Sequence, residues 1–230
     1  MTEISPAIAA RTALTEDLLA MAYQVEEQLA TAITALKDRN PALARLVLDR
    51  EKEINGFENR IEAGGIELLI RYQPVASDLR LTIMTLKISA DLERIGDHAV
   101  NIAHRAIFLA GHAQLKPLID IPLMAQRAGG MLKTAVDAFT RRDASACRKV
   151  LEEDAVIDEL RSQIFRELLT YMAADLTAIE RAMQLILVAK DLERVADLAT
   201  NIAEDVIYLV EGRNIKHLEH DPAGEGGAAE

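Results

Sequence analysis

Apolar residues recur along most of this chain at steps of three and four, the spacing that places side chains on one face of an α-helix. Capping residues followed by proline mark two helix starts, at Ser5-Pro6 and Asn40-Pro41. The stretch Thr177-Ala178-Ile179-Glu180 has the capping-box pattern of a third start. Together these signals predict six long helices, over residues 6–38, 41–73, 74 or 78–109, 118–141, 144–172 and 177–212.

A 13-residue stretch at residues 91–103 returns at residues 191–203, with 9 of its 13 positions identical. The helices before the two copies also match, at an offset of 103 (154 minus 51), so the repeat covers three helices in up-down-up order. The predicted fold class is therefore all-α, as two tandem, structurally similar three-helix bundles. We expect them at residues 1–112 and 113–213, followed by a disordered acidic tail at 214–230.

On a helical wheel the third helix has an apolar face and, opposite it, an acidic face formed by Glu93, Asp97 and Asn101. The sixth helix repeats this acidic face with Glu193, Asp197 and Asn201. We expect both acidic faces to lie on the outer surface. A stripe of basic residues lies beside the first one: Arg80, Lys87, Arg94, His98 and Arg105. The residues expected to face the core are Leu81, Met84, Ile88, Leu92, Ile95, Ala99, Ile102, Ala106 and Leu109, and in the repeat Val188, Leu192, Val195, Ala199, Ile202, Val206 and Leu209.

The second and fifth helices offer further oxygen ligands at four-residue spacing, Glu51 with Asn55 and Asp154 with Asp158. Carboxylates four residues apart repel each other mildly, and a bound cation reverses that cost. Oxygen ligands favour hard metal ions, whereas Zn²⁺ more often takes His or Cys. We predict metal sites for Mg²⁺, Mn²⁺, Fe or Zn²⁺, of unknown identity, at Glu51, Asn55, Glu93, Asp97, Asn101, Asp154, Asp158, Glu193, Asp197 and Asn201.

Composition narrows the class of protein. Half of the 230 residues are hydrophobic but only 3% are aromatic, which suits long helices packed through aliphatic side chains. The net charge of −11 argues against a nucleic-acid partner. A single cysteine, Cys147, fits a reducing compartment. No signal peptide or membrane span is evident, so we expect a cytoplasmic protein that meets the membrane only through partners.

The stretch Arg71-Tyr72-Gln73-Pro74-Val75-Ala76-Ser77-Asp78-Leu79-Arg80, together with the repeated motif at residues 91–97 and 201–205, resembles the signature of the PhoU family. The resemblance covers residues 4–212. It implies a cytoplasmic protein, often a homodimer, that works with the phosphate ABC transporter ATPase (PstB) and a PhoR-like sensor histidine kinase to repress phosphate-starvation signalling when phosphate is plentiful. It also implies multinuclear metal clusters at the E/D-x-x-x-D motifs, with a weaker first site because Asn55 stands where Asp158 keeps an acid.

Three alternative functions make different demands on the residues. A di-iron enzyme requires Glu-x-x-His motifs, and none of the five histidines has Glu three residues before it. Because no phosphate-binding glycine loop or activated nucleophile is evident either, we expect a non-enzymatic protein. A helical histidine-phosphotransfer protein would use His98, but the repeat has Leu198 there, so we expect His98 to be an exposed polar residue or a peripheral ligand. The sequence is also compatible with a third alternative, a scaffold protein that binds no metal.

Overall fold

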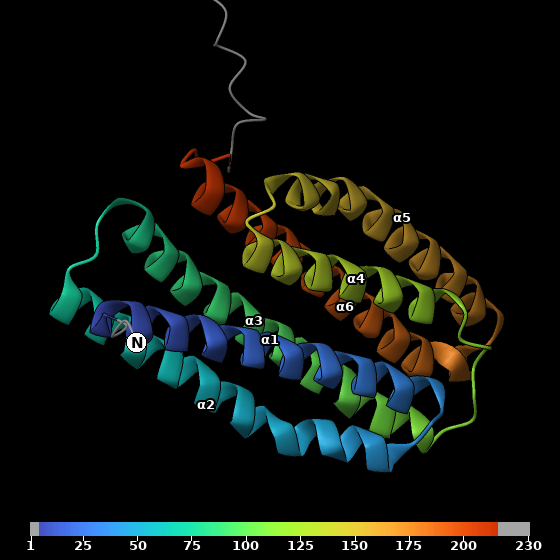
Figure 1. Ribbon diagram of the computed structural model, residues 1–230. Helices are drawn as coiled ribbons and strands as arrows, with labels where there is room; N and C mark the ends of the chain where they lie inside the picture. Colours follow the sequence, from blue (N-terminus) through green and yellow to red (C-terminus); the bar gives the residue numbers. More distant parts are fainter. Residues whose placement is uncertain (1–4, 216–230) are drawn as a thin grey trace, which may run out of the picture.

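The protein is described here by a computed structural model that covers residues 5–215 (Figure 1). Six long helices and one short 3-10 turn account for almost all of these residues, which confirms the predicted all-α class. The predicted tail at 214–230 lies mostly outside the described residues. The elements are α1 (Pro6–Lys37), α2 (Pro41–Tyr72), α3 (Ala76–Ala110), α4 (Asp120–Arg141), α5 (Ala144–Ala174), the 3-10 turn η1 (Leu176–Ala178) and α6 (Ile179–Glu211).

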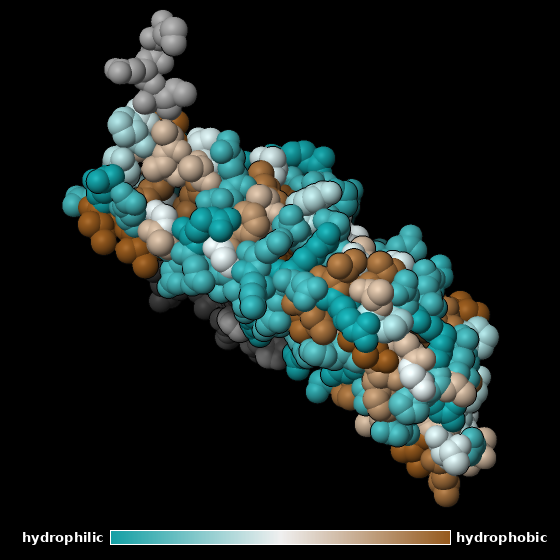
Figure 2. Space-filling view, turned by 90° about the horizontal axis from the view of Figure 1, so that it is seen from below, coloured by the Kyte–Doolittle hydropathy of each residue, from teal (hydrophilic) through white to brown (hydrophobic). Residues whose placement is uncertain are grey.

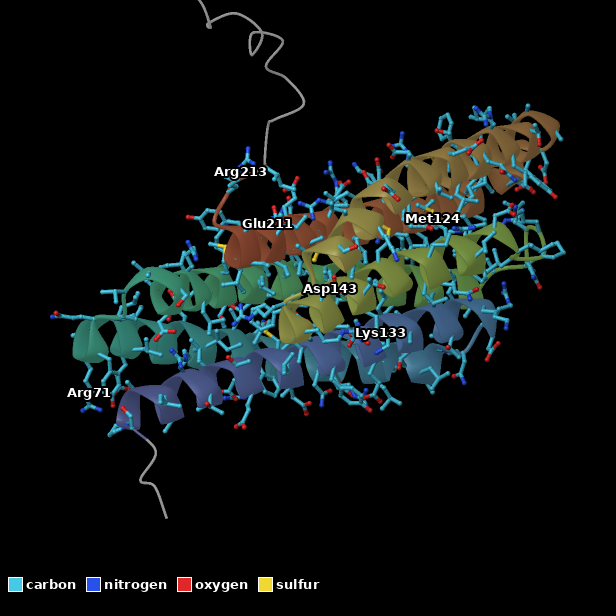
Figure 3. All side chains as sticks on the ribbon, turned by 45° about the horizontal axis from the view of Figure 1, so that its top comes forward. Arg71, Met124, Lys133, Asp143, Glu211 and Arg213 are labelled. Carbon is cyan, nitrogen blue, oxygen red and sulfur yellow. The ribbon has the colours of Figure 1, made fainter. Side chains whose placement is uncertain are left out.

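Side-chain caps begin α2 and α5, whereas α1, α3, α4 and α6 begin without one. The side chain of Asn40 accepts hydrogen bonds from the first turn of α2, as predicted, and Asp143 caps α5 in the same way (Figure 3). The Ser5 hydroxyl makes no capping bond, although a proline begins α1. The capping box predicted at Thr177 is wrong: Asp175 accepts from the backbone N–H and the hydroxyl of Thr177, and η1 intervenes before α6.

The two repeats form two three-helix units, which we call the first module (α1–α3) and the second module (α4–α6) (Figure 1). Within each module the three helices pack on one another, and α3 and α6 lie against each other at the centre. The residues predicted to face the core on α3 and α6 are all buried. The hydrophobic core is one continuous cluster that runs through both modules. The predicted boundary between residues 112 and 113 stays a prediction.

Buried ion pairs join α3 to α6, which run antiparallel. Asp191 is only 7% exposed, and its carboxylate oxygens lie 2.6 Å from the Arg105 guanidinium and 3.0 Å from Nδ1 of His98. The Arg105 contact is an ion pair without hydrogen-bond alignment. Near the other end of the contact, Nζ of Lys87 lies 2.6 Å from the buried carboxylate of Asp205. These three helix-to-helix contacts fix the register of the two modules.

The basic stripe predicted beside the first acidic face is therefore largely not a feature of the protein surface. Lys87, His98 and Arg105 point toward α6, where Lys87 and Arg105 neutralise its buried acids and Nδ1 of His98 lies 3.0 Å from Asp191. The helical wheel of α3 alone places these side chains on a polar flank but does not show that α6 covers that flank. His98 is 22% exposed and is not the exposed residue that the sequence suggested. Its contact with Asp191 gives it a structural role, which weakens the phosphotransfer alternative.

The connection between the modules is also fixed by charged groups. The Arg39 guanidinium, after α1, donates to the carbonyl oxygens of Leu109 and Ala110 at the C-terminal end of α3, where backbone acceptors lack helical partners. Lys116, in the loop that follows, is buried and forms ion pairs with Asp120 of α4 and with Glu167 of α5. The loop is thus bound at both ends, so the second module is held in one orientation.

Most of the face seen from below is hydrophilic, with hydrophobic side chains gathered in smaller patches (Figure 2). Charged side chains likewise project outward along the helices in Figure 3. In the part of the chain that the structure describes, no helix combines the length and apolar character needed to span a membrane.

We predict that the buried carboxylate of Asp191 is worth far more to stability than an exposed one. Asp191→Asn leaves Arg105 without its counter-charge in the module contact, and should lower the free energy of unfolding by roughly 3 kcal/mol. The matched change Asp137→Asn affects only exposed ion pairs, at 3.8 Å from Lys133 and Arg141, and should cost less than about 1 kcal/mol. Urea denaturation measures both; equal losses would contradict the assigned contact.

Candidate functional site

The first acidic cluster lies where α2 packs on α3. Glu93 of α3 is partly buried, and its pKa is raised chiefly by that burial and then by the negative charges of Asp97, Glu58 and Glu51, against the opposing charge of Arg94. Repulsion of this kind requires the carboxylates to be close neighbours. The structure therefore brings together the predicted acids of helices α2 and α3, on the surface side of α3 as expected.

Glu58 belongs to this cluster, and the sequence analysis missed it. Burial raises the pKa of Glu58, and the charges of Glu62 and Asp97 raise it further. The signal was present in the sequence, because Glu51, Asn55, Glu58 and Glu62 follow one another at steps of four, three and four on one face of α2. A wheel of the second helix, like the one drawn for the third, reveals them as one stripe.

The second acidic cluster occupies the equivalent position between α5 and α6. Burial raises the pKa of Asp154, and the charges of Asp197, Asp158 and Glu193 add to that rise. All four acids predicted on these two helices thus lie together. Asp158 is exposed, whereas Asp154, Glu193 and Asp197 are partly buried.

Guanidinium groups balance the second cluster but not the first. Arg161 lies 3.1 Å from the carboxylate of Glu193, and Arg194 lies 3.1 Å from that of Asp197. Arg161 stands, at the 103-residue offset, where the first module has Glu58. One position of the repeat therefore adds a negative charge to the first cluster and a positive charge to the second. The expectation that the first site is the less charged one is wrong.

The arginines at equivalent positions of α3 and α6 form ion pairs with acids at different positions of the repeat. Arg94 lies 3.5 Å from Asp91, three residues before it, whereas Arg194 pairs with Asp197, three residues after it. The difference follows from the contact between the modules, because Asp191 is already held by Arg105 and His98. In the part of the chain that the structure describes, Asp97 consequently has no arginine within ion-pair distance.

The predicted amide ligands are less closely associated with the two clusters than the acids are. Asn101 is exposed, and Asn55 and Asn201 are partly buried. Asn55 uses its backbone carbonyl to accept a hydrogen bond from Asn59. Among residues 5–215, no hydrogen bond connects the three amide side chains to the acidic clusters.

The two clusters differ in how well they suit a metal ion. Within the described residues, no three His, Cys, Asp or Glu side chains stand in an arrangement that holds a metal. The chemistry of the first cluster nevertheless fits a hard cation, because its carboxylates supply oxygen donors and repel one another in the absence of positive charge. The second cluster fits less well, because Arg161 and Arg194 already balance two of its four acids.

We predict opposite effects of removing equivalent charges in the two clusters. In metal-free protein at pH 7, Glu93→Gln should raise Tm, because the ionised carboxylate is partly buried and is also repelled by its neighbours. A raised pKa in the folded state means that ionising Glu93 costs stability. That cost is absent below the pKa of the unfolded chain and grows as pH rises through the folded pKa, so the gain should vanish below about pH 4.

The matched control is Glu193→Gln, which breaks the ion pair with Arg161 and should not raise Tm at pH 7. Thermal denaturation followed by circular dichroism, at pH 7 and in acid, measures both variants. A similar gain for both would show that the two clusters do not differ in charge balance.

Comparison with known proteins agrees with this duplicated architecture. Residues 18–106 and 121–206 each match the family model described as PhoU domain. The chain is 42% identical over 210 residues to the phosphate-specific transport system accessory protein PhoU homolog of Aquifex aeolicus, covering 91% of this chain and 95% of that protein. The accessory protein PhoU of Escherichia coli is 32% identical over 204 residues, covering 89% and 85%.

Solved structures show the same fold. The crystal structure of PhoU from Pseudomonas aeruginosa superposes with a TM-score of 0.87 at 39% identity, over 89% of this chain and 99% of that one. The phosphate transport system regulatory protein PhoU from Streptococcus pneumoniae gives a TM-score of 0.84 at 27% identity, over 91% and 99%. With two matched domains and relatives aligned over nearly its whole described length, the chain belongs to the PhoU family.

Proposed function

We propose that this protein is a non-enzymatic accessory regulator of phosphate-specific transport. The observation that carries the proposal is the double match to the PhoU domain, on both modules, in a chain whose relatives are named accessory or regulatory proteins of that transport system. The geometry agrees with this role, because the polar groups singled out lie on helix surfaces rather than around a reaction centre. Rigid helices of this kind present surfaces to partners.

The finer proposal is that it acts in the cytoplasm as a homodimer. Its partners would be the ATPase of the phosphate transporter and a phosphate sensor histidine kinase. In this arrangement it represses the phosphate regulon when phosphate is plentiful. Support comes from the family resemblance and from the acidic surface, whose net charge of −11 disfavours direct contact with nucleic acid or anionic lipid.

A second part of the proposal concerns metal. The first acidic cluster would hold a divalent cation, Mn²⁺, Fe²⁺ or Mg²⁺ in preference to Zn²⁺, through carboxylate oxygens of Glu51, Glu58, Glu93 and Asp97. The pKa values of Glu58 and Glu93 are raised by burial and, beyond that, by repulsion between the carboxylates, and the bound ion would relieve this repulsion. Asn55 and Asn101 lie on the same helix faces and are neutral oxygen donors. The second cluster, around Asp154, Asp158, Glu193, Asp197 and Asn201, would bind more weakly.

Calorimetric titration of chelator-treated protein with Mn²⁺ tests the metal proposal. At a Mn²⁺ concentration of about 100 times Kd, binding should stabilise the fold by about 2.7 kcal/mol, or roughly 5–10 °C in Tm. The paired change Glu93→Gln with Asp97→Asn should abolish this shift, whereas Glu193→Gln with Asp197→Asn should preserve most of it. A Tm that does not respond to Mn²⁺ would leave the acidic face as a docking surface for basic partners.

Deletion in the host tests the regulatory proposal. Cells without the protein should express alkaline phosphatase constitutively at high phosphate, because the starvation response is no longer repressed. A plasmid copy of the intact chain should restore repression. Unchanged phosphatase activity in the deletion strain, with phosphate plentiful, would contradict the role.

A further inference from the structure

A cleft in the second module lies along the same pair of helices as the second acidic cluster but has the opposite charge. Its volume is about 380 Å³, within the range of small-molecule sites. The residues that line it come from α5 and α6 and are Arg161, Ser162, Phe165, Arg166, Ile186, Ala189 and Lys190. Three of these seven side chains are cationic and none is acidic, in a chain with 37 acidic and 26 basic residues.

Two of the three cations of the cleft are available to a ligand. Among the described residues, Arg166 and Lys190 have no ion-pair partner, and both are exposed. Arg161 is held by Glu193, which places its guanidinium between the acidic cluster and the cleft. Guanidinium and ammonium groups clustered in this way bind phosphate groups, the guanidinium often through two parallel hydrogen bonds.

The neutral part of the cleft is apolar and includes an aromatic ring. Phe165 is 45% exposed, although the other three phenylalanines are buried or partly buried. Ile186 and Ala189 of α6 also line the cleft. An exposed aromatic ring beside cations suits a ligand with a planar apolar group next to its negative charge, because stacking on the ring removes both surfaces from water.

The first module shows that the fold itself does not require this arrangement. At the offset of 103 residues, Glu58, Asn59, Glu62 and Ala63 stand where α5 has Arg161, Ser162, Phe165 and Arg166. At the offset of 100 residues, Ala90 stands where α6 has Lys190. All three cations and the aromatic ring therefore belong to the second repeat alone. The equivalent helices of the first module, α2 and α3, pack together without them.

We propose that this cleft binds a nucleotide, with the base stacked on Phe165 and the phosphates held by Arg161, Arg166 and Lys190. Ser162 is the one uncharged polar side chain that lines the cleft, so little is present to distinguish the hydrogen-bonding edges of different bases. The site should accordingly accept purine nucleotides with little selectivity between adenine and guanine. Charge attraction makes binding sensitive to salt.

Calorimetric titration of the full-length chain with ADP tests the site. ADP should bind, adenosine should bind at least about tenfold more weakly because it lacks the phosphates, and inorganic phosphate should bind weakly because it lacks the base. Absence of ADP binding at millimolar concentration would overturn the proposal. Competition by inorganic phosphate as effective as that by ADP would overturn the role of Phe165.

Variants locate the binding. Arg166→Ala and Lys190→Ala restore the residues that the first module has at these positions, so both should fold normally, and each should weaken ADP binding by roughly tenfold. Phe165→Ala should weaken ADP but leave the weak binding of inorganic phosphate unchanged. Arg45→Ala, at an exposed arginine on α2 of the first module, removes the same charge and should have no effect. Equal weakening by Arg45→Ala would mean that ADP responds only to net charge.

Discussion

The antiparallel contact between α3 and α6 is the constraint on which the rest of the structure depends. It joins two three-helix modules into one continuous core, and it buries two carboxylates, those of Asp191 and Asp205. A buried carboxylate is tolerated only with a counter-charge, and Lys87 and Arg105 of α3 supply it. Any other alignment of α3 and α6 would leave a buried charge unpaired, so these contacts select one register. Apolar packing alone would specify that register less strictly.

That register also decides the electrostatics of the surface. Because Arg105 of α3 already pairs with Asp191, Arg194 pairs with Asp197 and balances the second cluster. In the first module Arg94 pairs with Asp91, so Asp97 has no arginine within ion-pair distance among the described residues. The difference in charge between the two clusters is larger still because the first module has Glu58 where the second has Arg161. Two copies of one motif thus carry different chemistry: the first module has a carboxylate cluster suited to cations, and the second combines balanced acids with a neighbouring basic cleft.

Much of this could be predicted from the sequence because much of it is local or periodic. The apolar positions of α3 and α6 face the core, since burial of aliphatic surface dominates the free energy of packing. The predicted acids Glu93, Asp97, Glu193 and Asp197 stay partly or fully exposed. Glu58 was within reach of the same reasoning. The capping box at Thr177 failed because Asp175 competes for the same N–H group and forms a separate turn first.

The sequence by itself determined the helices, their repeat and the buried faces, because these follow from side-chain spacing along one chain. Only the tertiary structure decided the role of the basic residues of α3. A helical wheel gives the direction of Lys87, His98 and Arg105 but not what lies in that direction, and α6, more than 80 residues further along the chain, covers them. The basic cleft was likewise decided only by the tertiary structure. Its cations come from two helices, α5 and α6, and no local sequence pattern specifies how these helices approach each other.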